Sequence, residues 1–299
     1  MKPKMFLAIA LVAALAQGGV GHAAPASPRP KLRVGVTLHP YYSWTARVVA
    51  GTPAEVVPVL PGEVDAGNYQ PRPDDIRKLA DLDAIVVNGV GHDDFIFDMI
   101  KASGNQRIEV IRPNDGVPLI RALRGGTVNS HTFISFSNAI QQTYTIARAL
   151  GRLRPEWSQR YRDNAAAYAR RLREIKNRAA ARLANARIDR VVTVHDGYSY
   201  LMQEFGIEVA GVVEPAHGLL PSARELGEMV DLLKREKIRV VFSEASFPSD
   251  LLDVLRDEAG AKVYVISHIA TGPYSPEQFE EEMQKNVDSM VKALVTDAG

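Results

Sequence analysis

Short runs rich in Val and Ile alternate along this chain with longer helix-like stretches, and this alternation constrains the fold more than any other feature. Most of the apolar runs lack strict alternation with polar residues, which is typical of strands buried on both faces. Such strands, separated by helices, predict parallel sheets with crossover helices. The predicted strands are Leu32–Leu38, Glu55–Leu60, Ala84–Asn88, Ile108–Arg112, Val191–Val194, Glu208–Val213, Arg239–Ser243 and Lys262–Ser267.

The middle of the chain has a different pattern. From Pro155 to about Arg187 there is no Gly and no second Pro, and the good helix formers Ala, Arg, Leu and Glu dominate. We predict one rigid linker helix over 154–188, roughly 45–50 Å long. It divides the β/α pattern into an N-terminal lobe, 32–153, and a C-terminal lobe, 189–299. The predicted fold class is therefore α/β, with two Rossmann-like lobes that have parallel sheets and are joined by one long helix. The shorter helices are predicted at Tyr41–Ala50, Asp74–Ala80, Asp94–Ser103, Ser222–Glu236 and Pro248–Gly260.

The N-terminus has the pattern of a secretion signal. Lys2 and Lys4 precede the apolar run Met5–Ala16, which is shorter than the roughly 20 residues that a membrane helix needs. A stretch of small residues follows, so we predict a cleaved signal peptide over 1–24 and a flexible, Pro-rich lead-in over 25–31. No cysteine stands at the junction to carry a lipid, and we expect a soluble, exported protein.

The composition excludes several classes of protein. The 36 Lys and Arg residues nearly balance the 35 Asp and Glu residues, which argues against a nucleic-acid partner. Since the chain has no cysteine, it cannot form disulfides, thiolate nucleophiles or iron–sulfur clusters. There is also no His-Glu-x-x-His pair, no Gly-x-Ser-x-Gly elbow and no P-loop, so we expect no enzyme.

The histidines after the signal peptide follow the predicted strands. Ligands of open α/β sheets bind beyond the carboxyl ends of the strands. Five of the six histidines lie at or just past such ends, and the sixth lies in a loop, so we expect them to meet in one cleft between the lobes. These predicted metal ligands are His39, His92, His131, His195, His217 and His268.

Imidazole is the commonest metal ligand in proteins. A carboxylate beside a ligating histidine orients the ring by accepting a hydrogen bond from its free N–H. Candidates for this role are Asp93, Asp196 and Glu214. The alternative for any single histidine is a structural role in place of metal binding. The alternative for the acids is that they are ordinary solvated surface residues. Six converging imidazoles would make an octahedral site that favours Fe(II), whereas three or four would favour Zn(II).

Five segments resemble, in the same order, motifs of the metal-binding substrate-binding proteins of zinc, manganese and iron ABC importers. These segments are Asp65–Asp75, Asn88–Gly91, Asn129–Phe133, His195–Gly206 and Phe242–Glu244. The resemblance implies two lobes that close little around the ion, and a periplasmic receptor that docks on an inner-membrane permease driven by an ATPase. It also adds Glu244, at the end of a predicted strand, to the orienting carboxylates.

The sequence departs from the pattern of this family at two of the metal ligands. Gly67 stands where the family has its first histidine ligand, and His268 lies near the position of its last carboxylate ligand. Only His131 and His195 carry over as ligands by motif. A site made of histidines alone resembles periplasmic receptors for ferrous iron, including those that accompany siderophore-iron release.

We therefore expect a monomeric periplasmic receptor that captures a divalent transition metal, Fe(II) before Zn(II) or Mn(II), and delivers it to a permease. The alternatives are a zinc or manganese receptor of the same family, and a metal chaperone or chelator that acts in siderophore-iron release, with a second periplasmic binding protein as a candidate partner. A receptor for an organic ligand is a further alternative, although aromatic residues are only 7% of the chain.

Overall fold

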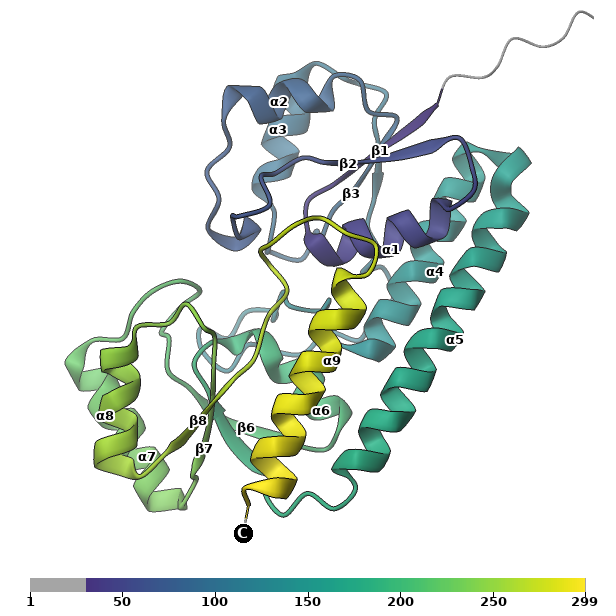
Figure 1. Ribbon diagram of the computed structural model, residues 1–299. Coiled ribbons are helices and arrows are strands. Elements are labelled where there is room, and N and C mark those ends of the chain that lie inside the picture. The colour runs from purple at the N-terminus through teal and green to yellow at the C-terminus, as the bar shows by residue number, and fades with distance from the viewer. Residues whose placement is uncertain (1–30, 299) are drawn as a thin grey trace, which may run out of the picture. The chain divides into compact units, whose positions relative to one another are not determined.

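Two parallel four-stranded sheets form the centres of two lobes in the computed structural model, which describes residues 31–298 (Figure 1). The predicted signal peptide lies outside the described residues, as does all of the lead-in except Lys31. Among residues 31–298, no helix is both long and apolar enough to cross a membrane.

The sheet of each lobe has the same strand order, and all eight predicted strands are confirmed. The first sheet has the order β2-β1-β3-β4 and the second β6-β5-β7-β8. Their strands are β1 (Leu32–Val36), β2 (Ala54–Pro58), β3 (Ala84–Val86), β4 (Glu109–Ile111), β5 (Arg190–Thr193), β6 (Glu208–Val212), β7 (Val240–Ser243) and β8 (Lys262–Val265). In each sheet, successive strands are added on opposite sides of the strand that comes first in the sequence. The point where the direction changes lies between β1 and β3 in the N-terminal lobe and between β5 and β7 in the C-terminal lobe. Such switch points are where open α/β sheets bind ligands.

Helices cover the sheets because their apolar residues recur on one face. The N-terminal lobe has α1 (His39–Val49), α2 (Pro73–Leu79) and α3 (Phe95–Ser103), and the C-terminal lobe has α6 (Ser199–Glu204), α7 (Ala223–Glu236) and α8 (Ser249–Ala259). In α7 the buried residues Leu226, Met229, Val230 and Leu233 have the spacing of a single helical stripe. A Ser222–Glu225 capping box begins this helix.

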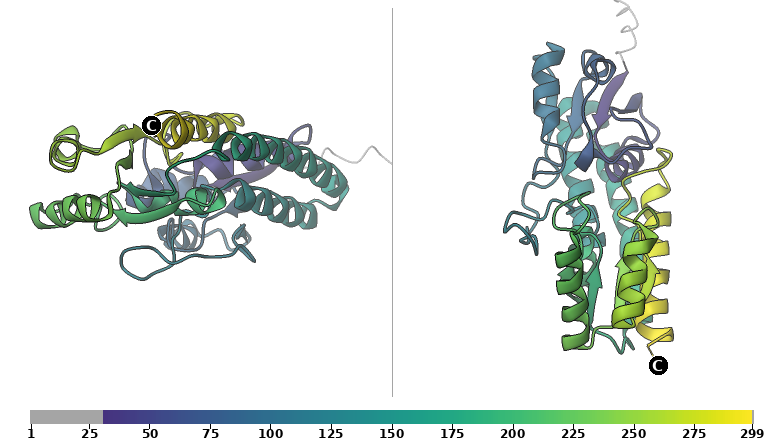
Figure 2. Two further views of the ribbon diagram at one scale, coloured as in Figure 1. Left: turned by 90° about the horizontal axis from the view of Figure 1, so that it is seen from below. Right: turned by 90° about the vertical axis from the view of Figure 1, so that its left-hand side faces the viewer.

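One long helix runs along both lobes, as predicted, and two further helices lie beside it (Figures 1 and 2). These three helices are α4 (Phe136–Leu153), α5 (Ser158–Leu183) and α9 (Gln278–Val291). The linker helix α5 is shorter than predicted, because Pro155–Trp157 forms a separate 3-10 turn and the helix ends at Leu183. We call α4, α5 and α9 together the spine.

The helix α9 comes from the end of the chain, in the range predicted for the C-terminal lobe. It packs on β8 of that lobe and also on α1 of the N-terminal lobe and on α5. Its buried Glu280 pairs with Arg47 of α1 and with Arg171 of α5. The lobes are thus connected by side chains as well as by the linker.

Candidate metal centre

Each of the eight strands is followed by a side chain that faces the region between the lobes or lies at its border. In the N-terminal lobe the segments after β1, β2, β3 and β4 carry His39, Asp65, His92 and His131. In the C-terminal lobe the segments after β5, β6, β7 and β8 carry His195, His217, Glu244 and His268. The parallel strands therefore bring residues that are far apart in sequence to facing sheet edges.

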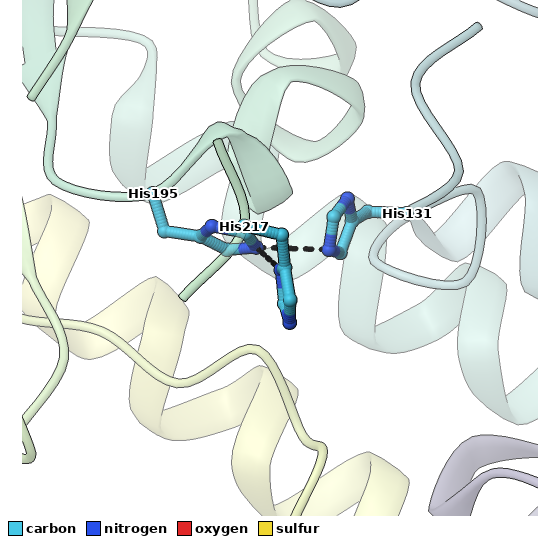
Figure 3. A group of neighbouring side chains, drawn as sticks. All are labelled: His131, His195 and His217. Carbon is cyan, nitrogen blue, oxygen red and sulfur yellow. Dashed lines mark hydrogen bonds between the residues drawn. The ribbon is translucent and has the colours of Figure 1, made fainter. Parts of the chain in front are cut away.

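Three imidazoles form the centre of the site (Figure 3). His195 Nε2 lies 2.8 Å from His131 Nε2 and 3.1 Å from His217 Nδ1. One nitrogen from each ring lies within 4.8 Å of the others. Since metal–imidazole bonds are about 2.0–2.1 Å long, these three nitrogens can bind one ion with small adjustments of the rings.

His92 and His268 extend this group to five rings. The ring centroid of His92 lies 4.9 Å from that of His131, and the centroid of His268 lies 5.3 Å from that of His195. We call His92, His131, His195, His217 and His268 the histidine cluster. All are buried except His217, whose side chain is 23% exposed.

The carboxylate of Asp65 joins three members of the cluster. Its Oδ2 lies 2.8 Å from His217 Nε2 and 3.0 Å from His268 Nε2, while Oδ1 lies 3.4 Å from His92 Nε2. His92 Nε2 is buried and makes no hydrogen bond with any residue in the described part of the chain. A buried nitrogen without a partner is costly, and a metal ion between the rings would satisfy it.

The electrostatics divide the cluster into neutral and charged imidazoles. Burial and the neighbouring imidazoles hold the pKa of His131 well below its usual value. Burial also lowers the pKa of His195, against its hydrogen bond with Glu214. These two rings are therefore neutral, which is the form that binds metal.

His268 and Asp65 form a charged pair. Burial opposes the charge of His268, but its hydrogen bonds with Asp65 and Glu244 raise its pKa to about 10. Burial also opposes ionisation of Asp65, but hydrogen bonds from His217 and His268 and the nearby ring of His92 outweigh it and lower the pKa of Asp65. Without metal, the site thus contains an imidazolium beside a carboxylate.

Two of the predicted orienting carboxylates contact imidazoles. Glu214 Oε2 lies 2.9 Å from His195 Nδ1, and Glu244 Oε1 lies 2.9 Å from His268 Nδ1. The hydroxyl of Tyr198 donates to Glu244 Oε1 at 3.0 Å. These contacts turn the other nitrogen of each ring towards the cluster, as a metal site requires.

Asp93 and Asp196, for which we expected the same role, have other partners. The buried carboxylate of Asp93 accepts from Thr37 Oγ1 and from the backbone N–H groups of Asn88 and Gly89. Asp196 accepts from the N–H of Leu123 and the hydroxyl of Ser199. Both acids hold loops that carry the histidines, because a short side chain in a turn reaches nearby amides before a ring.

The structure does not bring His39 into the cluster. Its Nε2 lies 3.0 Å from the carbonyl oxygen of Gly272, and its ring stacks on Tyr274 with centroids 4.1 Å apart. Among residues 31–298, no ring contact joins His39 to the other five histidines. It is also the first residue of α1, two residues further past its strand than predicted. Its role as a ligand stays a prediction.

Asp65 was not among the predicted site residues. It lies seven residues after β2, at the start of a 3-10 turn, Ala66–Asn68, in a loop that contains no histidine. The signal that could have identified Asp65 is its position past the end of a parallel strand. The same signal predicts the histidines of the site.

A cavity of about 930 Å³ opens beside the cluster. His195, His217, His268, Asp65 and Glu244 all contribute to its wall. The cluster is therefore reached from solvent without passing through the core of either lobe.

Two β/α lobes that present buried imidazoles to each other, with a helical spine along both, form a binding protein whose small ligand is held between the lobes. Residues 34–293 match the model of the family described as zinc-uptake complex component A, periplasmic, and the chain belongs to this family of metal-binding substrate-binding proteins. The resemblance seen in the five sequence segments is confirmed.

Solved structures of the SBP FpvC from P. aeruginosa are similar along nearly the whole described chain. FpvC in complex with Ni2+ is 46% identical, with a TM-score of 0.84, and the match covers 90% of this chain and 98% of that one. FpvC in complex with Mn2+ is also 46% identical, with a TM-score of 0.85 and coverage of 90% and 100%. The predicted two-lobe fold is confirmed.

A curated relative is longer than this chain. The zinc-binding protein AdcA of Streptococcus pyogenes is 22% identical over 292 residues, which are 89% of this chain and 56% of AdcA. This chain therefore spans about half the length of AdcA.

Proposed function

We propose that this protein is a periplasmic receptor that binds one divalent transition-metal ion in the histidine cluster and delivers it to the permease of an ABC importer. The convergence of five imidazoles from both lobes carries the proposal. A neutral His131 and His195, the unpartnered nitrogen of His92 and the absence of cysteine all suit a borderline metal ion. The permease and its ATPase are proposed from the family, whose description is that of an uptake-complex component.

Ferrous iron is the favoured metal in this proposal. The five imidazoles and the oxygen of Asp65 offer up to six donors, and Fe(II), Mn(II) and Ni(II) accept six, whereas zinc in proteins is almost always four-coordinate. The similar FpvC structures hold Ni2+ and Mn2+. Zn(II) bound by His131, His195, His217 and one further donor is the alternative, and the zinc-binding relative AdcA supports it.

An anaerobic titration tests the metal and its coordination. Protein freed of metal by a chelator is titrated with Fe(II), Mn(II) and Zn(II), and X-ray absorption then reports the ligands of the bound ion. We expect one ion per chain with about six nitrogen and oxygen neighbours. A four-coordinate zinc ion bound more tightly than iron would support the alternative, and no binding of any of these ions would contradict the proposal.

Two alanine variants test the ligand set. His131→Ala removes a central imidazole and should weaken binding severely, since it takes away a donor that faces two others. His39→Ala tests the prediction that His39, the sixth histidine, is a metal ligand. A severe loss would mean that His39 leaves Gly272 when metal binds, and unchanged affinity would limit the imidazole ligands to the histidine cluster.

A further inference from the structure

Gly67 faces the ring of His217 across the space between the lobes. A β-carbon at position 67 would lie 2.5 Å from His217 Nε2 and 2.8 Å from His217 Cδ2. Carbon atoms do not approach a ring so closely, so even a methyl group at this position must displace the imidazole. The imidazole cannot move freely, because Asp65 and His195 contact its two nitrogens.

A second glycine makes the reciprocal contact. A β-carbon at Gly218, the neighbour of His217, would lie 2.4 Å from Asn68 Nδ2, the neighbour of Gly67. Gly218 also has a φ of +69°, a conformation that other residues rarely adopt. The segments 67–68 and 217–218 therefore interlock, each with a glycine facing a side chain of the other.

Asp65 connects this contact with the metal centre. Its Oδ1 accepts a hydrogen bond from the backbone N–H of Gly67 at 2.9 Å, and its Oδ2 contacts His217 Nε2 at 2.8 Å. The carboxylate of Asp65 thus holds both the turn that contains Gly67 and the ring of His217, which fills the space beside Gly67. His217 is the most exposed ring of the cluster, but it also lies beside the rings of the other four members.

We propose that Gly67 is a positioning residue for the metal site, because its missing side chain leaves the space in which His217 is held towards the other imidazoles. Gly67 therefore sets how many imidazoles reach the ion. A side chain at position 67 would remove His217 from the site and favour metals that need fewer donors. This inference rests on the proposed metal-binding function.

The variant Gly67→Ala tests the proposal. We expect its affinity for Fe(II) or Mn(II) to fall about 10- to 100-fold, the range typical of residues that orient a ligand. X-ray absorption should show one nitrogen neighbour fewer, which a general loss of stability would not cause. Gly227→Ala in α7 is the matched control, since within residues 31–298 its β-carbon would meet no atom beyond its own helix backbone within 4 Å, and it should bind like the parent protein.

A double-mutant cycle shows whether Gly67 acts through His217. His217→Ala removes the ring, so adding Gly67→Ala to it should have no further effect on affinity, and the whole effect of Gly67→Ala should appear as coupling. An equal loss in both backgrounds would place the effect in the turn itself and would overturn the proposal. The proposal would also be overturned if Gly67→Ala bound metal with the affinity of the parent protein and with the same number of nitrogen neighbours in X-ray absorption.

A crystal structure of metal-free Gly67→Ala separates this inference from the proposed function. We expect the ring of His217 to have left Asp65 and His195, a result that needs no metal. If the ring keeps its place, the inference is wrong, whether or not the parent protein binds metal. If the parent binds no metal, the proposed function fails while the steric role of Gly67 is still measured.

Discussion

The two nitrogens of His195 have different partners, and this difference sets the state of the ring. Nδ1 lies 2.9 Å from Glu214, and Nε2 lies 2.8 Å from His131. A carboxylate at Nδ1 favours the tautomer with its proton there, which leaves the lone pair of Nε2 directed to the cluster. Glu214 therefore orients His195 with the lone pair of Nε2 towards the other imidazoles.

Glu214→Ala should weaken metal binding about 10- to 100-fold, as expected for loss of a carboxylate that orients a histidine. The number of nitrogen neighbours in X-ray absorption should stay the same, because all the rings remain. Glu228→Ala, which changes an exposed acid of α7, is the control and should bind normally. Unchanged affinity of Glu214→Ala would show that packing alone orients His195.

The raised pKa of His268 predicts opposite effects of pH on folding and on metal binding. Its pKa is about 10 in the folded protein, against 6.5 for an ordinary histidine. The charged ring thus stabilises the metal-free fold fully below pH 6.5, and this contribution is lost as the pH rises through 10. Metal needs the neutral ring, so its affinity should rise over the same interval, by about tenfold per pH unit for one released proton.

Two measurements check this prediction. Urea unfolding of chelator-treated protein should show a falling free energy of unfolding between pH 6.5 and 10, and competition titrations should show tighter metal binding. His268→Gln should flatten both profiles. A metal affinity that falls with rising pH in the parent protein would contradict the assigned charge of His268.

The strand ends predicted that all six histidines lie together, and five of them do; they neither set His39 apart nor indicated which carboxylate joins the five rings. The positions of His92, His131, His195, His217 and His268 follow from parallel topology, which the apolar runs predict. The contacts of Asp65 depend on how the two lobes face each other. That arrangement is a tertiary property, and no pattern within either half of the sequence specifies it.

At the scale of elements, the strands were easier to predict than the helices of the spine. A strand buried on both faces has an apolar run that can be read locally, as in Val191–Val194. In α9 the buried Phe279, Met283, Val287 and Met290 have helical spacing, but their partners lie on α1 and α5. Sequence spacing predicts a buried face, and only the tertiary structure shows which lobe that face contacts.

One side chain of α6 caps the spine helix α4. Glu204 accepts hydrogen bonds from the backbone N–H groups of Phe136 and Ser137, each at 2.8 Å, and Lys176 Nζ of α5 lies 2.9 Å from it. Its side chain is only 5% exposed. A carboxylate at a helix N-terminus also interacts favourably with the helix dipole, so Glu204 fastens the C-terminal lobe to two spine helices.

Glu204→Ala should lower the free energy of unfolding by about 2 kcal/mol, since it leaves the N–H groups at the start of α4 and a half-buried ammonium without their charged partner. Urea unfolding of the metal-free protein measures this change. Glu174→Ala alters an exposed acid of α5 and should change little. The metal stoichiometry of Glu204→Ala should remain that of the parent, and its loss would mean that the spine also shapes the site.

For the whole molecule, the spine restricts how far the lobes can separate. The helix α5 runs along both lobes with α4 and α9 beside it, and Glu280 of α9 pairs with Arg47 and Arg171. A wide hinge motion would break these pairs and expose the packed faces of α4 and α5. We therefore expect the ion to be taken up by movements of loops and side chains.

Metal should stabilise the protein without a large change of shape. At a free-ion concentration of 100 times Kd, binding adds about 2.7 kcal/mol, which corresponds to a rise in Tm of about 5 °C for a chain of this size. A chelator should reverse the shift, and His131→Ala should lack it. Small-angle scattering should give the same radius of gyration with and without metal, and a clear contraction would contradict the restricted motion.

The placement of one site side chain after each strand has a consequence for how such a receptor can change during evolution. The side chains of the histidine cluster lie in loops, while the sheets and the spine hold those loops in place. A substitution in one loop can therefore exchange a nitrogen donor for an oxygen donor without repacking a sheet. Metal preference and fold stability are consequently encoded in largely separate residues, so natural selection can alter the first while preserving the second.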